Sequence, residues 1–453
     1  MILHEDTIVA LATPNGVGAI GVIRLSGPQA ITIANSVFKG KDLTKQASHT
    51  IHFGHVADGE VLLDEVLMSL FVAPRSYTRE NVVEISCHGS TYILESIIRL
   101  LIKQGARAAK PGEFTLRAFL NGQLDLSQAE AVADLIAANS KASQQVALQQ
   151  LRGGFSNQLT SLREQLVQFA SLVELELDFS EEDVEFANRD QLKQLVVDTM
   201  RVIGGLIKSF ELGNAIKQGV NTVIAGRPNA GKSTLLNALL NEERAIVSHI
   251  AGTTRDTIEE VLNIKGINFR LIDTAGIREA TDAIEQIGVE RTMEKINQSA
   301  LIIYVYDAAQ ITVEELDADI EKLHRPGVNL LLVANKIDLL TEDQFNALPA
   351  EAIQVSAQQK QHIDELKDKI YYAAIKEQLT GSETLVTNIR HLEALQKTEE
   401  ALNRVLNGID GYITSDFLAM DIKQALHYLG EITGTVTTDD LLDNIFSKFC
   451  IGK

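Results

Sequence analysis

One eight-residue motif restricts the fold of this 453-residue chain more than any other feature. The segment Gly226–Ser233, GRPNAGKS, fits the pattern G-x-x-x-x-G-K-[ST] and joins the apolar run TVIA to the helix-forming run STLLNALL. Its glycines allow backbone N–H groups to close around phosphate oxygens, and the helix N-terminus adds its positive dipole. Lys232 can reach the β- and γ-phosphates, and Ser233 can hold Mg²⁺. The motif therefore predicts a strand, a phosphate-binding loop and a helix in that order.

Three later motifs specify the nucleotide. DTAG, at Asp273–Gly276, ends the next strong apolar run, and its aspartate can hold Mg²⁺ through water while Gly276 offers its N–H to the γ-phosphate. NKID, at Asn335–Asp338, ends a third run, and its last carboxylate can accept hydrogen bonds from N1–H and the 2-amino group of guanine. Adenine lacks that pair of donors. VSA, at 355–357, follows, where a backbone N–H can contact the guanine O6, so the four motifs together predict GTP binding.

The loop SHIAGTTRDT lies between the first two motifs and is the candidate switch loop over the γ-phosphate. Ser233 and Thr254 are the predicted Mg²⁺ ligands. The predicted GTP contacts are Asn229, Ala230, Gly231, Lys232, Ser233, Thr234, Ser248, His249, Ile250, Ala251, Gly252, Thr253, Thr254, Asp273, Thr274, Ala275, Gly276, Asn335, Lys336, Asp338, Ser356 and Ala357. Ile277 follows DTAG where common GTPases use a water-orienting glutamine, so the catalytic group must come from elsewhere.

Hydrophobic periodicity divides the chain into four segments. Residues 1–120 mix strands with a helix that ends at Gly105, which predicts a small α+β domain. Residues 121–218 and 377–453 are helical, with an apolar stripe that the glycines at 153–154 interrupt. Residues 219–376 alternate helices with short strands that are apolar on both faces, which predicts a parallel sheet covered on both sides. The expected fold is multidomain: an α+β N-terminal domain, an α-helical central domain and an inserted α/β P-loop domain.

Two further patterns have competing interpretations. The run VELELDFSEEDVEF carries seven carboxylates, which indicates either a solvated helix end and loop or a divalent-metal site. The first is favoured because no histidine or turn-forming glycine accompanies the acids. NGVGAIG contains G-x-G-x-x-G at Gly16, Gly18 and Gly21, but VIRLSG follows it and predicts a strand. A dinucleotide site needs a helix there, so a glycine-rich turn is favoured.

The amino-acid composition limits the class of protein and the cellular compartment that we expect. The net charge of -20 argues against non-specific nucleic-acid binding, and no apolar run reaches the about 18 residues of a membrane span. Only two cysteines, Cys87 and Cys450, are present, and the N-terminus has no signal-peptide pattern, so we expect a protein of the reducing cytoplasm. The terminal CIGK is a poor prenylation box because Gly452 takes an aliphatic position and Lys453 is last, so no membrane anchor is expected.

The GTP motifs, the segment PGEFTLRAFLNGQLDLSQAEAVADLI and the terminal CIGK closely resemble the MnmE (TrmE) family of bacterial and organellar tRNA-modification GTPases. The resemblance covers essentially the whole chain, including the inserted G domain. It implies a GTP-hydrolysing enzyme in a complex that adds an aminomethyl or carboxymethylaminomethyl group to C5 of the wobble uridine of certain tRNAs. It also implies a homodimer and a partner, MnmG (GidA), that brings FAD and NADH.

The resemblance implies a tetrahydrofolate derivative, 5-formyl or 5,10-methylene, on a dimerising N-terminal domain. The matching folate contacts are Arg24, Glu84, Gln123 and Lys453, and Cys450 is a candidate active-site thiol, as nucleophile or as acid/base. The family often has lysine where this chain has Gln123, which keeps a hydrogen-bond donor and loses the charge. Without the resemblance, Arg24 and Glu84 would be interpreted as an ordinary surface ion pair.

The resemblance further implies a potassium-activated GTPase whose G domains pair across the nucleotide. Asn229, Ser248, Ile250 and Thr253 match the potassium site, and Glu285 matches the glutamate that positions the attacking water. A potassium ion there can do the electrostatic work of an arginine finger. The residues alone leave Glu285 as an exposed helix position. A regulatory or ribosome-assembly GTPase with the same G domain is the alternative, although such proteins usually carry a basic RNA-binding module and this chain is acidic.

Overall fold

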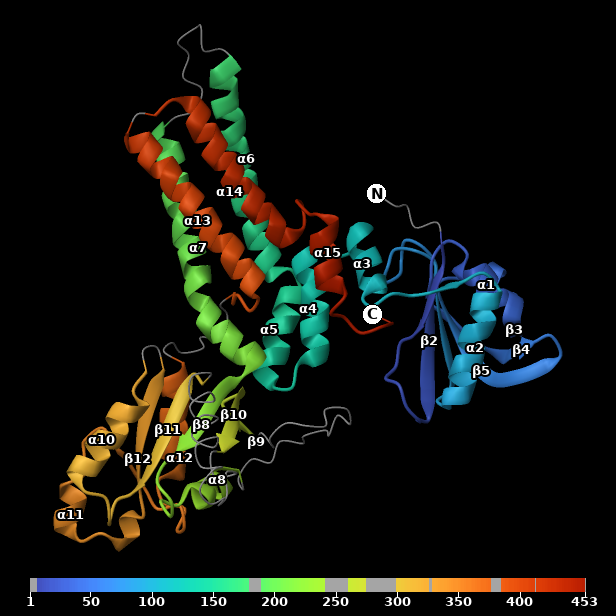
Figure 1. Cartoon of the computed structure of the whole chain (residues 1–453). Helices are drawn as coiled ribbons and strands as arrows, with labels where there is room; N and C mark the ends of the chain where they lie inside the picture. Colours follow the sequence, from blue (N-terminus) through green and yellow to red (C-terminus); the bar gives the residue numbers. More distant parts are fainter. Residues whose placement is uncertain are drawn as a thin grey trace, which may run out of the picture. The chain divides into compact units, whose positions relative to one another are not determined.

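The structure is a computed structural model that describes residues 6–178, 189–240, 260–273, 299–325, 328–375, 384–411 and 413–452. The chain forms two compact units (Figure 1). The first contains Met1–Ile136, Leu148–Met200 and Ala394–Lys453, and the second contains Ala137–Ala147 and Arg201–Glu393. Mixed-sheet, helical and α/β parts are all present, which confirms the expected fold class. The boundaries 1–120, 121–218, 219–376 and 377–453 stay a prediction.

A seven-stranded sheet forms the N-terminal part of the first unit, in the order β3-β4-β5-β6-β2-β1-β7. Its strands are β1 (Ile8–Leu11), β2 (Ile20–Ser26), β3 (Phe38–Lys39), β4 (Thr50–Asp58), β5 (Val61–Phe71), β6 (Val82–His88) and β7 (Arg107–Ala108). Neighbouring strands are antiparallel, except that β1 pairs parallel with β7. The helices α1 (Ala30–Val37) and α2 (Thr91–Lys103) pack with the sheet in one core, and η1 (Leu43–Lys45) follows β3. The segment after NGVGAIG is strand β2, antiparallel to β1, which confirms the glycine-rich turn and excludes the dinucleotide site.

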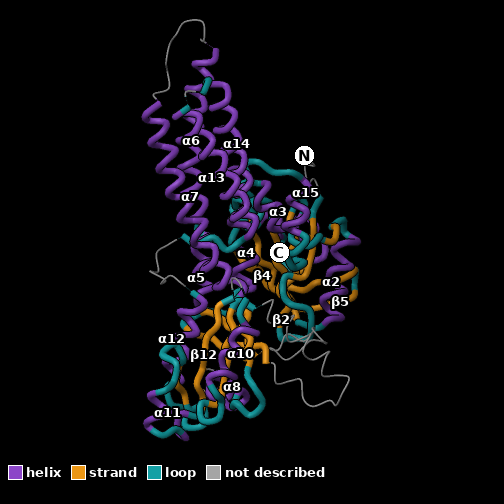
Figure 2. The backbone as a smooth tube through the Cα atoms, turned by 60° about the vertical axis from the view of Figure 1, so that its left-hand side comes forward, coloured by secondary structure: helices purple, strands orange, loops and turns teal. Residues whose placement is uncertain are grey.

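The helical part of the chain consists of helices from distant segments. They are α3 (Glu113–Leu120), α4 (Leu126–Ala137), α5 (Lys141–Leu151), α6 (Gly154–Asp178), α7 (Arg189–Gln218), α13 (Ile389–Asp410), α14 (Ser415–Thr433) and α15 (Asp439–Phe446). Figures 1 and 2 both show α6, α13, α14 and the first part of α7 running side by side. The predicted apolar stripe is confirmed, because Phe155, Leu159, Leu166 and Val173 are fully buried. Gly153, with φ of 80°, separates α5 from α6 where a break was expected.

The carboxylate-rich run is described only as far as the end of α6. Glu176 accepts hydrogen bonds from Arg189 at 2.7 Å and from the Ser415 hydroxyl at 3.2 Å, and Glu174 pairs with Lys423 of α14. These acids therefore link helices of the bundle. Among the described residues no group of three or more metal-binding side chains is present, and residues 179–186 of the run lie outside that part. No helix in the described part is long and apolar enough to cross a membrane.

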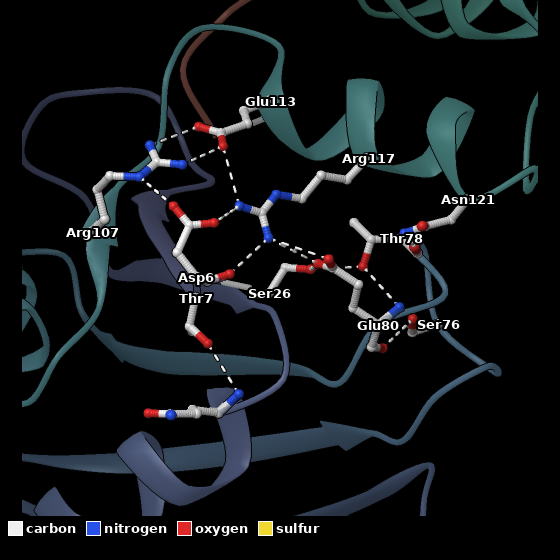
Figure 3. A network of polar contacts seen from close by, with 11 residues as sticks. Asp6, Thr7, Ser26, Ser76, Thr78, Glu80, Arg107, Glu113, Arg117 and Asn121 are labelled. Carbon is white, nitrogen blue, oxygen red and sulfur yellow. Dashed lines mark hydrogen bonds and ion pairs between the residues drawn. The ribbon is translucent and has the colours of Figure 1, made fainter. Parts of the chain in front are cut away.

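A network of charged side chains around the buried Arg117 fixes α3 to the N-terminal sheet (Figure 3). The Arg117 guanidinium, 1% exposed, contacts Asp6 at 2.7 Å, Glu113 at 3.2 Å and Glu80 at 3.2 Å. Arg107 pairs with both Asp6 and Glu113. Burial raises the pKa of the Glu113 carboxyl, but the Arg107 hydrogen bond and the two positive charges outweigh it and hold that pKa below its usual value. Because breaking a buried ion pair leaves an uncompensated charge, the network fixes α3 in one position.

The second unit is built on a six-stranded sheet in the order β13-β12-β11-β8-β10-β9. Its strands are β8 (Val220–Ala225), β9 (Glu260–Ile264), β10 (Ile267–Asp273), β11 (Leu301–Asp307), β12 (Asn329–Asn335) and β13 (Ile353–Val355). All neighbours are parallel except β9, which is antiparallel to β10. The predicted parallel strands are confirmed, and the edge strand β9 was not predicted.

Helices cover both faces of this sheet, as its two-sided apolar strands predict. Alternate residues of β11 enter two different cores. One core includes α8 (Lys232–Leu240) and α12 (Ile363–Ala374), and the other includes α10 (Val313–Leu323). The shorter η3 (Ile337–Leu339) and α11 (Glu342–Asn346) lie between β12 and β13. Since the central strands are parallel, the loops that follow them meet at one edge of the sheet.

Candidate functional site

The phosphate-binding loop between β8 and α8 has the backbone that its glycines predict. Gly226 and Gly231 have φ of 152° and 94°. A Cβ on Gly226 would lie 2.0 Å from the Val305 carbonyl oxygen, and one on Gly231 would lie 2.2 Å from Asn335 Nδ2. Only glycine fits at either position. Asn229 is also left-handed, with φ of 62°, a conformation that asparagine tolerates better than most residues.

The loop holds its lysine close to the backbone. Lys232 Nζ donates to the carbonyl oxygens of Gly226 at 2.7 Å and Arg227 at 2.9 Å. Ser233 and Thr234 are exposed in the first turn of α8, next to the positive end of the helix dipole. A cation, free hydroxyls and a helix N-terminus thus converge where a phosphate group can bind.

One buried side chain joins three of the motifs. Asn335, 2% exposed at the end of β12, donates from Nδ2 to the Ala230 carbonyl at 2.9 Å. Its Oδ1 accepts the backbone N–H of Ala357 at 3.0 Å. The amide therefore holds the phosphate loop and the VSA segment at a fixed separation.

The rest of NKID and VSA lies at the same edge of the sheet. Lys336, with φ of 65°, pairs through Nζ with Asp307 Oδ2 at 2.7 Å. Asp338 is exposed in η3, so its carboxylate is available to a base, whereas Ser356 is fully buried. Ser356 Oγ accepts from the Gln359 N–H at 3.3 Å and so shapes the loop after β13.

The structure brings together every described residue of the predicted GTP set that follows β8, β12 or β13. Asp273 ends β10, where it pairs in register with Ile224 of β8. The remaining residues of the predicted GTP and potassium sites, with Glu285 and Lys453, lie outside the described part of the chain. They are Ser248, His249, Ile250, Ala251, Gly252, Thr253, Thr254, Thr274, Ala275, Gly276, Glu285 and Lys453.

Arg227 of the phosphate loop is a site residue that the sequence did not reveal. Its guanidinium pairs with Glu315 at 2.5 Å and Asp319 at 2.7 Å, both on α10. The Arg227 hydrogen bond lowers the pKa of the Glu315 carboxyl. Tyr304 also donates to Asp319, at 2.5 Å. The motif did not predict these contacts, because Arg227 occupies a position at which G-x-x-x-x-G-K-[ST] allows any residue.

A second polar site lies on the N-terminal sheet. Arg24 of β2 pairs with Glu84 of β6 directly across the strands, with Nε to Oε1 at 2.9 Å. The Arg24 guanidinium carbon lies 5.6 Å from the centroid of the Tyr77 ring and 5.7 Å from that of Phe114. Phe114 belongs to α3, so the charge network around Arg117 positions this wall of the site.

The C-terminal tail reaches the same place. Arg24 Nη1 donates to the Gly452 carbonyl at 3.4 Å. Gly452 has φ of 94°, and a Cβ there would lie 2.1 Å from the Leu11 carbonyl oxygen. Cys450 is exposed, and its carbonyl accepts the Gly112 N–H at 3.4 Å. The structure therefore brings Arg24, Glu84 and the tail together.

Gln123 and Cys87 make other contacts in this domain. Gln123 is exposed, and its Oε1 accepts from Arg79 Nε at 2.9 Å. Cys87 is a buried residue of β6, and burial, with the nearby charge of Asp64, raises the pKa of its thiol to about 11. Cys87 is therefore a core residue and not a reactive thiol.

A parallel sheet with GRPNAGKS, NKID and VSA at one edge defines a P-loop protein of the GTPase class. The family model of the GTP-binding protein TrmE N-terminus matches residues 7–123, and that of the MnmE helical domain matches 126–450. The tRNA modification GTPase MnmE of Cytophaga hutchinsonii is 58% identical over 99% of this chain and 98% of that protein. Those of Christiangramia forsetii and Flavobacterium psychrophilum are 54% and 53% identical, over 99% and 100% of both chains.

The chain therefore belongs to the MnmE family of tRNA modification GTPases. This makes it a GTP-hydrolysing enzyme that takes part in tRNA modification, and its class implies binding of GTP and Mg²⁺.

Replacing Asn335 by alanine tests the link between the loops. The change removes the buried hydrogen bonds that the Asn335 side chain makes with the Ala230 carbonyl and the Ala357 N–H. Because each unsatisfied buried group costs about 1–3 kcal/mol, we expect GDP affinity to fall at least about tenfold. The measurement is a fluorescence titration with labelled GDP. Asn346→Ala, at an exposed position on α11, is the matched control, and equal affinities in the two variants would contradict the link.

Proposed function

We propose that this chain is the GTP-hydrolysing component of a complex that adds an aminomethyl or carboxymethylaminomethyl group to C5 of the wobble uridine of certain tRNAs. The observation that carries the proposal is the Asn335 amide, which joins the phosphate loop to the VSA segment in a member of this family and so supports a guanine-nucleotide site at this edge of the sheet. The complex is the homodimer with the flavin- and NADH-using partner MnmG, in the cytoplasm.

The residues at the sheet edge have separate roles in this proposal. Lys232 binds the β- and γ-phosphates, and Asp338 accepts the two guanine donors. The exposed hydroxyl of Ser233, with Thr254 and with Asp273 through water, would hold Mg²⁺, which prefers oxygen ligands. The ion supplies charge neutralisation at the phosphates, and the chain's own groups fix where those phosphates lie.

A substitution at Asp338 tests whether its carboxylate selects guanine over other bases. In Asp338→Asn, an amide that donates replaces an oxygen that accepts from the guanine 2-amino group. Xanthine carries a carbonyl there, so the variant should bind XTP. Hydrogen bonds to charged groups are worth about 1.5–3 kcal/mol each, so we expect GTP affinity to fall about 100-fold or more. A competition assay between GTP and XTP measures the relative affinities of the variant for the two nucleotides. Asp343→Asn, at an exposed position on α11, is the control. A GTP preference unchanged in Asp338→Asn would exclude the proposed base contact.

The proposal includes a potassium ion and pairing of G domains in the dimer. The exposed amide of Asn229 can offer an oxygen to a monovalent cation. Ser248, Ile250 and Thr253 would complete the site, and Glu285 would position the attacking water. A cation there would supply positive charge near the phosphates, in place of the missing glutamine and of an arginine finger.

Asn229→Gly tests the cation site without backbone strain, because glycine adopts the φ of 62° freely. In the wild-type chain we expect potassium to raise the rate of GTP hydrolysis at least about tenfold over sodium at equal ionic strength. The rate per chain should also rise with protein concentration. The variant should lose most of the potassium response, and Asn346→Gly should keep it. If the wild-type chain hydrolyses GTP at the same rate in potassium and in sodium, this part of the mechanism is refuted and a regulatory GTPase is favoured.

The one-carbon unit is proposed to come from a 5-formyl- or 5,10-methylene-tetrahydrofolate in the N-terminal domain. Arg24 offers a guanidinium to a carboxylate or carbonyl, Glu84 accepts from ring donors, and Lys453 at the end of the tail joins them. The Arg24–Gly452 hydrogen bond supports a site to which the tail contributes. Gln123 and the exposed thiol of Cys450 are the further proposed contacts.

Arg24→Gln separates this site from GTP hydrolysis. Losing a charged hydrogen bond of about 1.5–3 kcal/mol should weaken binding of 5-formyltetrahydrofolate about 10- to 100-fold, measured by calorimetry. GTP hydrolysis should stay unchanged. In cells that lack the native chain, the variant should fail to restore the modified wobble nucleoside, measured by mass spectrometry of tRNA digests. Arg99→Gln, on the exposed side of α2, is the control. Full folate binding and modification with Arg24→Gln would rule out this site.

A further inference from the structure

A relay of three asparagine side chains joins the G-domain sheet to the turn between α4 and α5. Asn268 of β10, 7% exposed, donates from Nδ2 to Asn139 Oδ1 at 2.6 Å. Asn263 of β9 donates from Nδ2 to Asn268 Oδ1 at 2.7 Å. Asn139 precedes the G-domain sequence by some eighty residues, yet its segment, Ala137–Ala147, belongs to the same compact unit as this sheet.

The direction of the relay is fixed by a backbone group. The Gly266 N–H donates to Asn263 Oδ1 at 3.1 Å, so Asn263 must present its NH₂ group to Asn268. The side-chain oxygen of Asn268 then accepts from Asn263, and its NH₂ group donates to Asn139. Asn139 therefore acts as an acceptor, and an oxygen at its Oδ1 position is sufficient for the contact.

Packing reinforces the relay on the same side. A Cβ on Gly266, in the tight turn between β9 and β10, would lie 3.1 Å from the Ala142 Cβ. Ala142 and Val146 pack against the core on one face of the sheet. Ser140 and Ser143 cap the start of α5 by reciprocal hydrogen bonds of 3.1 Å between each hydroxyl and the other residue's N–H. Hydrogen bonds and packing thus fix the turn that carries Asn139 where it enters α5.

The strand that receives the relay leads directly to the nucleotide site. β10 runs from Ile267, beside the turn, to Asp273, the first residue of DTAG. Asp273 pairs in register with Ile224, two residues before Gly226 of the phosphate loop. A shift of β10 along β8 would therefore move Asp273 relative to the phosphate loop.

We propose that Asn139 is a positioning residue for GTP hydrolysis, contributed from outside the G-domain sequence, which acts through Asn268 and β10 on Asp273. This rests on the proposed GTPase function. The Asn335 contacts that join the phosphate loop to the VSA segment involve residues that follow β8, β12 and β13, and none of these residues belongs to the relay. Loss of Asn139 should therefore lower kcat and spare nucleotide affinity. A contact that only stabilised the fold would lower the melting temperature and leave kcat and affinity unchanged at a temperature where the chain stays folded.

The test compares Asn139→Ala with Asn139→Asp in the full-length chain. Loss of one neutral hydrogen bond should lower kcat about fivefold in Asn139→Ala, with the KM for GTP and the Kd for GDP within about twofold of wild type. Asn139→Asp keeps the acceptor oxygen and should restore kcat. Asn407→Ala, an exposed asparagine on α13, should behave as wild type. Asn139 is itself exposed, so neither substitution needs to disturb a core.

The possible results separate the hypotheses. A kcat of Asn139→Ala equal to that of wild type overturns the positioning role and leaves the proposed function intact. A parallel loss of kcat, GDP affinity and melting temperature indicates a general disruption of the unit and also overturns the positioning role. Failure of Asn139→Asp to restore kcat contradicts the acceptor role. A wild-type chain that binds GTP and does not hydrolyse it in potassium with its partner would refute the proposed function itself.

Discussion

The side-chain amide of Asn335 is the contact on which the nucleotide site depends. It has one donor group and one acceptor group, and each is used on a different loop. The parallel sheet brings the carboxyl ends of β8, β12 and β13 to one edge, and the amide then sets the spacing of the loops there. Gly231 shows how tight this arrangement is, because any side chain at that position would displace the Asn335 nitrogen.

The α/β part of the fold was predictable because its signals are local. The strands of 219–376 are apolar on both faces, and each motif directly follows its own strand. The break at Gly153 and the turn after β1 were predictable for the same reason, since glycine and a change of period mark them in the sequence. The edge strand β9 was missed because it is short and carries polar residues between its apolar ones.

Polar contacts between distant segments were not predictable. Arg117 meets Asp6 across 111 residues, and Asn268 meets Asn139 across 129. A single charged or amide side chain has no periodicity, so nothing in one sequence pairs it with a partner. The Arg24–Glu84 pair is of the same kind, and only the resemblance to a family distinguishes these two residues from an ordinary surface ion pair. Arg227 and Gln123 show the limit of motifs, because Arg227 lies at an unrestricted position and Gln123 departs from the usual residue.

The order of the helices in the chain has a consequence for how the protein is made. Arg189 and Ser415 meet although 226 residues separate them, and Arg24 meets Gly452 across 428. At a synthesis rate of about 5–20 residues per second, α6 leaves the ribosome about 10–50 seconds before α14 is complete. The N-terminal sheet and the G-domain sheet are each encoded by nearly continuous sequence and can form in that interval. The bundle closes last, so its apolar stripe of Phe155, Leu159 and Leu166 is the surface most in need of protection in the nascent chain.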